Sequence, residues 1–404
     1  MMKAGWQLKA IGDVCDVVNG GTPKTGVKEY WDGQHQWITP AEMGKRATPY
    51  IGQTERTITD AGMQNSSARL LPNQSVILSS RAPIGHLVIN TKPMATNQGC
   101  KGLVPHHGLD SKYLYYYLVS IISLLNDLGT GATFKELSGG KLKEVLVPVA
   151  PLPEQQRIVA TLDEAFAGIA TARANAEKNR QNARALFESH LQSVFTEQGQ
   201  RWVDNKLKAI TTKIGSGATP RGGEESYKAE GISLIRSLNV HDMGFKYAKL
   251  AFLDDAQADD LSNVEVKARD VLLNITGASV ARCCIVPDDV LPARVNQHVS
   301  IIRPLQDVLA PEFLHYLLIS KPYKDKLLQT GEEGGSTRQA ITKAQIQDFN
   351  VTYPAFMDDQ LTVVTKLDSM LTETQRLESL YQQKIAALDE LKKFLLHQAF
   401  SGAL

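Results

Sequence analysis

The sequence predicts a mixed α/β chain with two globular domains in tandem, separated by two long helices and related by an internal repeat. Three observations predict this fold class. A repeat runs through nearly the whole 404-residue chain, short β-like runs alternate with turns in the first part of each copy, and an apolar stripe with helical spacing fills the second part. Hydrophobic residues make up 43% of the chain, which is enough for real cores, so wholesale disorder is excluded.

The repeat shows in motifs that recur in the same order. Residues 20–24 (GGTPK) match residues 217–221 (GATPR), and Asn97-Gln98 matches Asn296-Gln297. From Glu154 to Phe195 the second copy follows the first at a constant offset of 205 residues. Agreement in order, spacing and residue type over this length indicates a duplicated unit of about 200 residues.

Each unit begins with a part that is typical of a compact mixed domain. Short β-like runs lie in these parts at residues 75–79, 86–89, 271–275 and 299–302. Two longer apolar runs, at residues 113–125 and 313–320, are better interpreted as buried helices. We therefore predict four segments: a globular domain at 1–152, a long helix at 153–198, a globular domain at 199–356 and a long helix at 357–404.

The second part of each unit is predicted to be one long helix. Residues 151–154 (PLPE) form a strong helix start, with proline near the first position and an acid in the first turn. An apolar stripe over about 42 residues is typical of a coiled-coil seam and would make a rod of roughly 63 Å. Two helices packed on each other explain the stripes better than the alternative, in which each helix packs on its own domain. The stripes consist of Ile158, Leu162, Phe166, Ile169, Ala172, Ala176, Ala183, Leu186 and Val194, and of Val364, Leu367, Leu371, Leu377, Tyr381, Ile385, Leu388, Leu391 and Leu395.

The sequence carries no signature of catalysis or of a bound metal. No phosphate-binding loop, dinucleotide-binding glycine motif, zinc-protease helix or nucleophile elbow occurs, and the four cysteines lack paired ligand spacing. We therefore predict a non-enzymatic chain with no catalytic residue and no metal. The longest near-apolar run is 13 residues and the N-terminus lacks an apolar signal core, so we expect a cytoplasmic protein without a membrane span.

The turns at the ends of the predicted strands carry side chains that suit nucleic acid. Arginine binds guanine edges, asparagine and glutamine bind adenine, and serine, threonine and lysine bind phosphates. The predicted DNA-binding residues are Thr22, Lys24, Lys28, Ser80, Arg81, Lys101, Thr133, Lys135, Ser216, Thr219, Arg221, Asn274, Thr276, Thr337 and Arg338. For any one loop, an ordinary turn is the simpler interpretation, and Asn97-Gln98 and Asn296-Gln297 can equally be buried amides that satisfy the backbone. With a formal net charge of +1, the chain cannot hold DNA by charge alone.

The two copies differ at these turns. In the sequence alignment Ser79-Ser80-Arg81 corresponds to Ile275-Thr276-Gly277, and Lys101 corresponds to Ser300. The scaffold is kept while the candidate reading surface changes, which suits two modules that read two different targets.

Three motifs give the chain a likeness to a known family. Residues 21–24 (GTPK), 151–159 (PLPEQQRIV) and 398–404 (QAFSGAL) resemble those of the specificity (S) subunit of type I restriction–modification systems, and the resemblance covers the whole chain. It implies two target-recognition domains, two helices packed as an antiparallel coiled coil, and a chain that is not itself catalytic. It also implies that the helices bind partner subunits, with a predicted partner interface of Glu154, Gln155, Arg157, Phe195, Gln360 and Phe400.

The resemblance further implies double-stranded DNA and two methyltransferase subunits as partners, joined by two restriction subunits in systems that cleave. S-adenosylmethionine would be bound by the methyltransferase, and ATP and Mg by the restriction subunit. We predict a DNA-recognition subunit that reads an asymmetric two-part site and positions its partners for adenine N6 methylation or cleavage. The alternative is a tandem-domain coiled-coil adaptor that binds proteins without reading DNA, and an enzyme acting alone is a more distant third.

Overall fold

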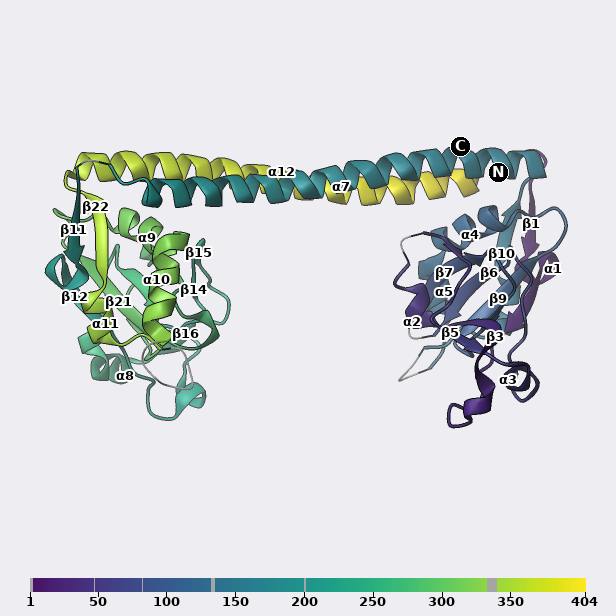
Figure 1. Ribbon diagram of the computed structural model, residues 1–404, viewed down its shortest axis with the longest axis horizontal. Helices are drawn as coiled ribbons and strands as arrows, with labels where there is room; N and C mark the ends of the chain where they lie inside the picture. Colours follow the sequence, from purple (N-terminus) through teal and green to yellow (C-terminus); the bar gives the residue numbers. More distant parts are fainter. Residues whose placement is uncertain (1–2, 47, 82, 132–134, 200, 333–339) are drawn as a thin grey trace. The chain divides into compact units, whose positions relative to one another are not determined.

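The computed structural model describes residues 3–46, 48–81, 83–131, 135–199, 201–332 and 340–404. The chain divides into two compact units (Figure 1). Unit 1 comprises Met1–Glu177 with Gln383–Leu404, and unit 2 comprises Lys178–Gln382. Each unit therefore holds one mixed α/β domain and a segment of each of two long helices, which confirms the predicted fold class.

The domain of unit 1 is built on three sheets that helices cover. Its strands are β1 Gln7–Ala10, β2 Cys15–Asn19, β3 Trp31–Ile38, β4 Tyr50–Ile51, β5 Arg56–Ile58, β6 Val76–Ser80, β7 Ile84–Asn90, β8 Met94–Thr96, β9 Cys100–Pro105 and β10 Leu146–Val149. Its helices are α1 Ile11–Val14, η1 Lys28–Tyr30, α2 Pro40–Met43, α3 Asp60–Gln64, α4 Ser111–Ser120, α5 Ile122–Leu128 and α6 Gly139–Glu144. The sheet orders are β2-β9-β6-β7-β4, β5-β3-β8 and β1-β10, and α4 and α5 pack on the largest sheet.

The domain of unit 2 follows the same plan. Its strands are β11 Trp202–Lys206, β12 Thr211–Ser216, β13 Ile232–Ile235, β14 Val240–His241, β15 Gly244–Phe245, β16 Ala251–Leu253, β17 Glu265–Val266, β18 Val271–Asn274, β19 Cys283–Ile285, β20 Ala293–Val295, β21 Val299–Pro304 and β22 Asn350–Pro354. Its helices are η2 Leu207–Ala209, η3 Gly223–Ser226, α8 Asp255–Asp260, η4 Ser262–Val264, η5 Gly277–Ser279, η6 Asp288–Val290, α9 Pro311–Ile319, α10 Lys321–Glu332 and α11 Lys343–Asp348. The sheet orders are β12-β21-β18-β19, β16-β13-β20-β17, β11-β22 and β14-β15.

The sheet orders identify equivalent strands in the two units. In each unit the first strand pairs antiparallel with the last strand before a long helix, as β1 with β10 and β11 with β22. The run β2-β9-β6-β7 matches β12-β21-β18-β19, and β5-β3-β8 matches β16-β13-β20. The predicted internal repeat is therefore present in the hydrogen bonding of the sheets.

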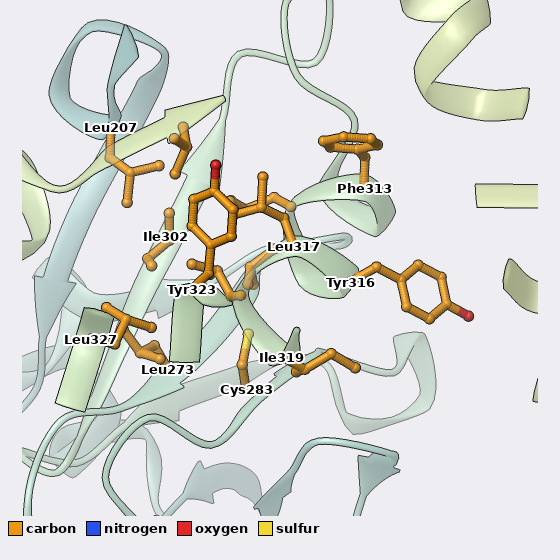
Figure 2. Close-up of a cluster of buried hydrophobic side chains, with 14 of the residues drawn as sticks. Leu207, Leu273, Cys283, Ile302, Phe313, Tyr316, Leu317, Ile319, Tyr323 and Leu327 are labelled. Atoms are coloured by element: carbon orange, nitrogen blue, oxygen red, sulfur yellow. The ribbon is translucent and has the colours of Figure 1, made fainter. Parts of the chain in front are cut away.

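The core of unit 2 lies between its sheets and its helices. Figure 2 shows part of it, in which Leu273 and Ile302 come from strands, Phe313 and Leu317 from α9, and Tyr323 from α10. The equivalent cluster in unit 1 packs α4 against β6, β7 and β9. The apolar runs that the sequence assigned to buried helices are thus confirmed as the helices that close these cores.

Two long helices complete the units, α7 (Leu152–Thr196) and α12 (Met357–Ser401). In unit 1, Arg157 donates to the Leu404 carbonyl at 2.7 Å and Arg173 pairs with Asp389, so the two helices run in opposite directions there. In unit 2, Arg180 donates to the Gln382 amide oxygen at 2.9 Å. Neither long helix, nor any other helix of the described residues, has the apolar run that crossing a bilayer requires.

The apolar stripes of the long helices differ from the prediction at one matched pair of positions. Leu186 and Leu391 are exposed to 66% and 43%, although both were assigned to the seam. The buried side chain is instead Phe187 on α7, and Leu396 on α12. Phe187 lies four residues before Leu191, one helical turn away on the same face, whereas Leu186 points off that face. The exposed leucines are available for contacts outside the unit.

A buried glutamine fastens the start of each long helix to its own domain. Gln155 accepts a hydrogen bond from the Asp110 amide at 2.8 Å and donates to the carbonyls of Gly108 and Ala150. Both Gln155 and Gln360 are fully buried. Their assignment to a partner interface is wrong, because every bond they make closes within the unit.

Gln360 repeats this arrangement in unit 2. It accepts from the Ala310 amide at 2.9 Å and donates to the carbonyls of Val308 and Pro354, both at 2.9 Å. The second helix start thus uses the same device, although residues 355–361 do not keep the PLPEQQR sequence of the first.

A tyrosine–aspartate hydrogen bond also recurs between each domain and its helix. Tyr116 donates to Asp163 at 2.5 Å, and Tyr316 donates to Asp368 at 2.5 Å. Burial holds the pKa of Tyr116 well above its ordinary value, and the hydrogen bond to Asp163 raises it further. The phenol therefore stays a hydrogen-bond donor.

Removing this hydroxyl should weaken unit 1. We expect Tyr116→Phe to lower the free energy of unfolding by about 1–3 kcal/mol, because the lost hydrogen bond has a charged acceptor. Chemical denaturation of the full chain measures the change. Tyr115→Phe is the control, since within the described residues the Tyr115 hydroxyl makes no hydrogen bond. Equal effects of the two substitutions would contradict a role for the Tyr116 hydroxyl.

Candidate nucleic-acid interface

The candidate interface is built at one strand end in each unit, where β6 and β18 stop. Leu78 of β6 lies opposite Lys101, and Leu273 of β18 lies opposite Ser300. Both strand ends therefore stand at the same position in equivalent sheets.

Backbone hydrogen bonds then match the residues that follow. The Ser80 amide donates to the Gly99 carbonyl at 2.8 Å, and the Ile275 amide donates to the His298 carbonyl at 3.0 Å. One residue further, Arg81 forms an isolated bridge with Glu136, as Thr276 does with Ala340.

These bonds correct the sequence alignment by one residue. Residues 79–81 correspond to residues 274–276, and Arg81 corresponds to Thr276 and not to Gly277. The predicted match of Lys101 with Ser300 is confirmed by the register. Gly99 corresponds to His298.

The strand end of unit 1 is charged. Arg81 and Lys101 both approach Glu136, with nitrogen–oxygen distances of 3.7 and 3.8 Å. Arg81 is about one third exposed, and Glu136 is 42% exposed. These long ion pairs leave the guanidinium and the carboxylate open to solvent and able to exchange partners.

The strand end of unit 2 is neutral and linked by hydrogen bonds. Thr276 bonds His298 Nδ1 at 2.5 Å, and Gln297 Nε2 lies 3.2 Å from His298 Nε2. The Thr219 hydroxyl bonds the other end of the same carboxamide, Gln297 Oε1. A threonine of the first turn is thereby joined to the strand end.

The asparagine of each Asn-Gln pair supports the backbone. Asn97 Oδ1 accepts from the Gly99 amide at 2.8 Å, and Asn296 Oδ1 accepts from the His298 amide at 3.0 Å. In unit 1, Asn97 Nδ2 also donates to the Thr22 hydroxyl at 3.0 Å. The sequence left two interpretations open for these pairs, a contact to DNA and an amide that satisfies the backbone. For both asparagines the structure supports the second.

Three predicted DNA contacts lie inside the domains. Ser80 and Asn274 are fully buried, and Lys101 is only 6% exposed. Ser80 and Asn274 end strands β6 and β18, in which every residue is buried, so both faces of the sheet are covered there. Lys101 lies on β9, another inner strand, whose first four residues are buried. These predicted contacts are therefore not at the surface.

The other predicted residues are more accessible. Lys24, Lys28, Lys135 and Arg221 are exposed, and Ser216 is half-buried at the end of β12. Three predicted residues, Thr133, Thr337 and Arg338, lie outside the described residues.

Sequence reasoning missed several groups at the surface. Arg56 stacks on Trp31, with its guanidinium carbon 3.7 Å from the ring centroid, and no motif marks it. Glu136 was missed because its charge opposes that of DNA. His298 directly follows Asn296-Gln297, and its position next to this repeated pair is the sequence signal that could have identified it as a site residue.

Half of the predicted partner interface is internal: Gln155, Phe195 and Gln360 are buried. Phe195 lies in the core of unit 2, so its assignment to a partner interface is wrong. Phe400 is half-buried and packs edge-on against Tyr113 in unit 1, and its place in a partner interface stays a prediction. Glu154 pairs with Arg157 and with Lys3, and these two partners hold the pKa of its carboxyl at about 2. The long helices also carry exposed apolar side chains: Leu152, Leu186, Leu361, Leu380, Leu391 and Phe394.

The described residues contain no group of three side chains suited to hold a metal ion. The four cysteines are buried and unpaired, and burial raises the pKa of Cys15, Cys100 and Cys284 to about 12. Such thiols are poor nucleophiles and poor metal ligands.

Comparisons with known proteins agree with this arrangement. Residues 3–178 match the family model of the type I restriction modification DNA specificity domain. The type I restriction enzyme MjaIX specificity subunit of Methanocaldococcus jannaschii is 42% identical over 159 residues, 39% of this chain and 37% of that protein. The EcoBI specificity subunit of Escherichia coli is 23% identical over 340 residues, 78% of this chain and 70% of that protein. Residues 3–178 belong to the family of type I restriction–modification DNA specificity domains.

Solved structures share the fold of this chain. One of them comes from a structural study of complex assembly and conformational transition of the type I R-M system. It has a TM-score of 0.79 at 18% identity, and both chains are covered completely. The HsdS subunit of Thermoanaerobacter tengcongensis has a TM-score of 0.63 at 17% identity, covering 100% of this chain and 98% of that one. The aligned part of this chain spans well under half of the length of its MjaIX relative.

The residues that match the family model include one of the two strand ends. The DNA specificity domain at residues 3–178 contains the strand end of unit 1, with Arg81, Gly99 and Glu136. The strand end of unit 2 lies beyond those residues, and the internal repeat relates it to the first.

Proposed function

We propose that this chain is a specificity subunit that reads an asymmetric DNA site in two parts, one with each unit. The observation that carries the proposal is the pair of matched strand ends. Their backbone hydrogen bonds are the same, yet Arg81, Gly99 and Glu136 in unit 1 are replaced by Thr276, His298 and Ala340 in unit 2. One scaffold with two different tips is what two readers of different targets require.

The chemistry at the strand end of unit 1 favours a G·C pair. A guanidinium such as that of Arg81 binds guanine O6 and N7, and a carboxylate such as that of Glu136 accepts from cytosine N4. Lys24, Lys28 and Lys135 are exposed in the same domain and suit phosphates, which position a protein on the duplex without specifying sequence. The strand end of unit 2 lacks these charges, so its half-site should differ.

The proposed partners are two methyltransferase subunits, joined by two restriction subunits in a system that cleaves. The chain itself would not catalyse: S-adenosylmethionine would bind to the methyltransferase, and ATP and Mg²⁺ to the restriction subunit. We assign protein contacts to the exposed apolar residues Leu186, Leu391 and Phe394, since these offer apolar surface on the long helices. With a net charge of +1, the chain needs such partners to close on DNA.

The experiment is to capture the tagged chain with its partners from its native cells and to select bound duplexes from a randomised pool. We expect a methyltransferase among the partners and an enriched motif in two unlike parts. Captured partners with no enriched sequence would favour the adaptor function. A palindromic motif would contradict two different readers.

Arg81→Ala tests the reader of unit 1. We expect the preference for guanine at one position of one half-site to fall by about 1–3 kcal/mol, the usual worth of a bidentate contact. The measurement is base frequency at each position of the selected pool. Lys28→Ala is the control and should weaken binding evenly over all sequences, as a phosphate contact does. An even loss with Arg81→Ala would make Arg81 a phosphate contact too.

A further inference from the structure

We propose that the Gln297 carboxamide reads an adenine in the half-site bound by unit 2, with Thr219 and His298 holding it in the reading orientation. The inference rests on the proposed function and names the base and the residue for one half-site. Gln297 is exposed and stands on the turn between β20 and β21, next to the strand end.

The hydrogen-bond inventory of the carboxamide carries the argument. A glutamine amide offers two N–H donors and two acceptor lone pairs. Thr219 uses one lone pair of Oε1, and His298 Nε2 accepts from one N–H of Nε2. One donor and one acceptor remain, which is the pattern that binds adenine N7 and N6 together.

The network also removes the freedom that a glutamine normally has. Fixing a long side chain costs rotamer entropy, and in Gln297 this cost is met before DNA binds. His298 is itself fixed, because its Nδ1 bonds Thr276 at 2.5 Å. Since Gln297 Nε2 can only donate, His298 Nε2 accepts and Nδ1 carries the proton, so the whole chain of bonds has one consistent direction.

Unit 1 provides a natural comparison at the same turn. Gln98 corresponds to Gln297 and is exposed, but in the described residues its side chain has no hydrogen-bond partner. The Thr22 hydroxyl, equivalent to that of Thr219, is taken by Asn97 Nδ2. The residue after Gln98 is Gly99, which has no side chain to hold an amide.

The exchange of Gly99 for His298 is sterically coupled to the strand end. A Cβ at Gly99 would lie 3.2 Å from both Cγ and Nε of Arg81, which is tighter than ordinary contact. A side chain at position 99 would require Arg81 to shift by a few tenths of an ångström, so glycine favours the present position of Arg81. At the equivalent place in unit 2, the short Thr276 leaves room for an imidazole. Each unit thus accommodates one large nitrogen-bearing side chain there, an arginine that can contact a base in unit 1 and a histidine that holds a glutamine in unit 2.

The space beside this network suits a base edge. An open hollow next to it is lined by His298 and Thr276 of the network and by Ser237, Leu238, Gly277, Ala278, Ser279 and Arg282. Gly277 has a φ of +74°, a conformation that favours glycine over residues with a Cβ.

The test is selection of duplexes from a randomised pool by the assembled complex, with sequencing of the bound fraction. For Gln297→Ala we expect the preference for adenine to fall roughly 5- to 150-fold at one position of one half-site, with the other half-site unchanged. Gln297→Glu keeps the size and the Thr219 bond but loses both N–H donors, so it should remove the adenine preference as well. Gln98→Ala, the matched substitution in unit 1, should leave both half-sites as they are.

His298 is a positioning residue, and a double-mutant cycle tests that role. His298→Ala should weaken the preference at the same position as Gln297→Ala and should add nothing when Gln297 is already alanine. A merely structural role for His298 would instead add its effect in both backgrounds. Thermal unfolding of each variant complex shows that the fold is kept.

Different failures separate this inference from the proposed function. If the unaltered complex enriches no sequence, the proposed function fails and the inference falls with it. If the unaltered complex enriches a two-part motif but Gln297→Ala keeps the full motif, only the inference is overturned. It is also overturned if the lost preference is for another base, or if binding falls evenly over all positions.

Discussion

Replacing Gln155 by leucine is expected to detach the start of α7 from the domain of unit 1. Gln155 is fully buried and serves three backbone groups, the amide of Asp110 and the carbonyls of Gly108 and Ala150. Each buried backbone group left unpaired costs about 1–3 kcal/mol, so the expected loss of stability for the three groups is roughly 3–9 kcal/mol. Leucine has a similar volume, which keeps steric change small and leaves the lost hydrogen bonds as the cause.

Hydrogen exchange of the full chain, followed by mass spectrometry, measures the effect where it occurs. Exchange should accelerate at Asp110 and in the first turns of α7, because these amides are protected by the fastened helix start. Gln156→Leu is the matched control, since Gln156 is the next residue and is exposed. In unit 2, Gln360→Leu should reproduce the effect around Ala310.

The outcome also distinguishes the internal role of Gln155 from the interface role that the family resemblance implied. An interface residue would leave exchange in the free chain unchanged and weaken only the binding of partner subunits. Acceleration in the free chain therefore supports the internal role. Unchanged exchange at Asp110 would contradict it.

The repeat and the long helices could be predicted because their signals are local in the sequence. The PLPE start combines proline and an acid in the first turn, and both restrict the backbone whatever surrounds them. The stripe was harder to place to the residue. Leu186 and Phe187 are adjacent and both apolar, and the choice between them depends on the exact phase of the helix against its neighbour.

The candidate site was predictable as a region but not residue by residue. The Arg81–Thr276 match is set by hydrogen bonds of Ser80 and Ile275 to a neighbouring strand, which sequence similarity does not report. Ser80 and Asn274 are of residue types that suit an exposed turn, and the sequence does not report that both faces of β6 and β18 are covered by other parts of the domain.

Buried polar side chains were the other source of error. Gln155 meets its partner Asp110 from 45 residues away, and nothing near either residue announces the contact. A glutamine in the first turn of a helix is usually exposed, which agreed with the partner interface that the family resemblance implied. Only the fold shows that Gln155 replaces water for three backbone groups at once.

Phe195→Ala is expected to release the end of α7 from the core of unit 2. The Phe195 ring is buried and lies edge-on to Phe313 at 5.4 Å between centroids, with Trp202 at 6.3 Å and Tyr323 at 6.5 Å. Phe313 and Tyr323 can be followed in Figure 2. Truncating a buried phenylalanine to alanine costs about 3–5 kcal/mol, through lost burial and the cavity that remains.

Phe400→Ala gives the matched comparison in unit 1. Phe400 stands on α12 where Phe195 stands on α7, and it meets Tyr113 and Tyr117 at 5.1 and 5.2 Å between ring centroids. It is only half-buried, so its truncation should cost less than that of Phe195. Leu186→Ala is the control on α7, because that side chain is 66% exposed and should leave stability nearly unchanged.

Denaturant unfolding and hydrogen exchange of the full chain together locate the change. Phe195→Ala should accelerate exchange around Phe313 and leave unit 1 protected, whereas Phe400→Ala should do the reverse around Tyr113. If Phe195 were instead a contact for a partner subunit, the free variant would unfold like the unaltered chain. The helix α7 begins on the domain of unit 1, where Gln155 bonds Asp110, and its residue Phe195 packs in the core of unit 2. A loss of stability confined to unit 2 would therefore show that Phe195 anchors the end of α7. The helix of the first repeat would then be held by the domain of the second.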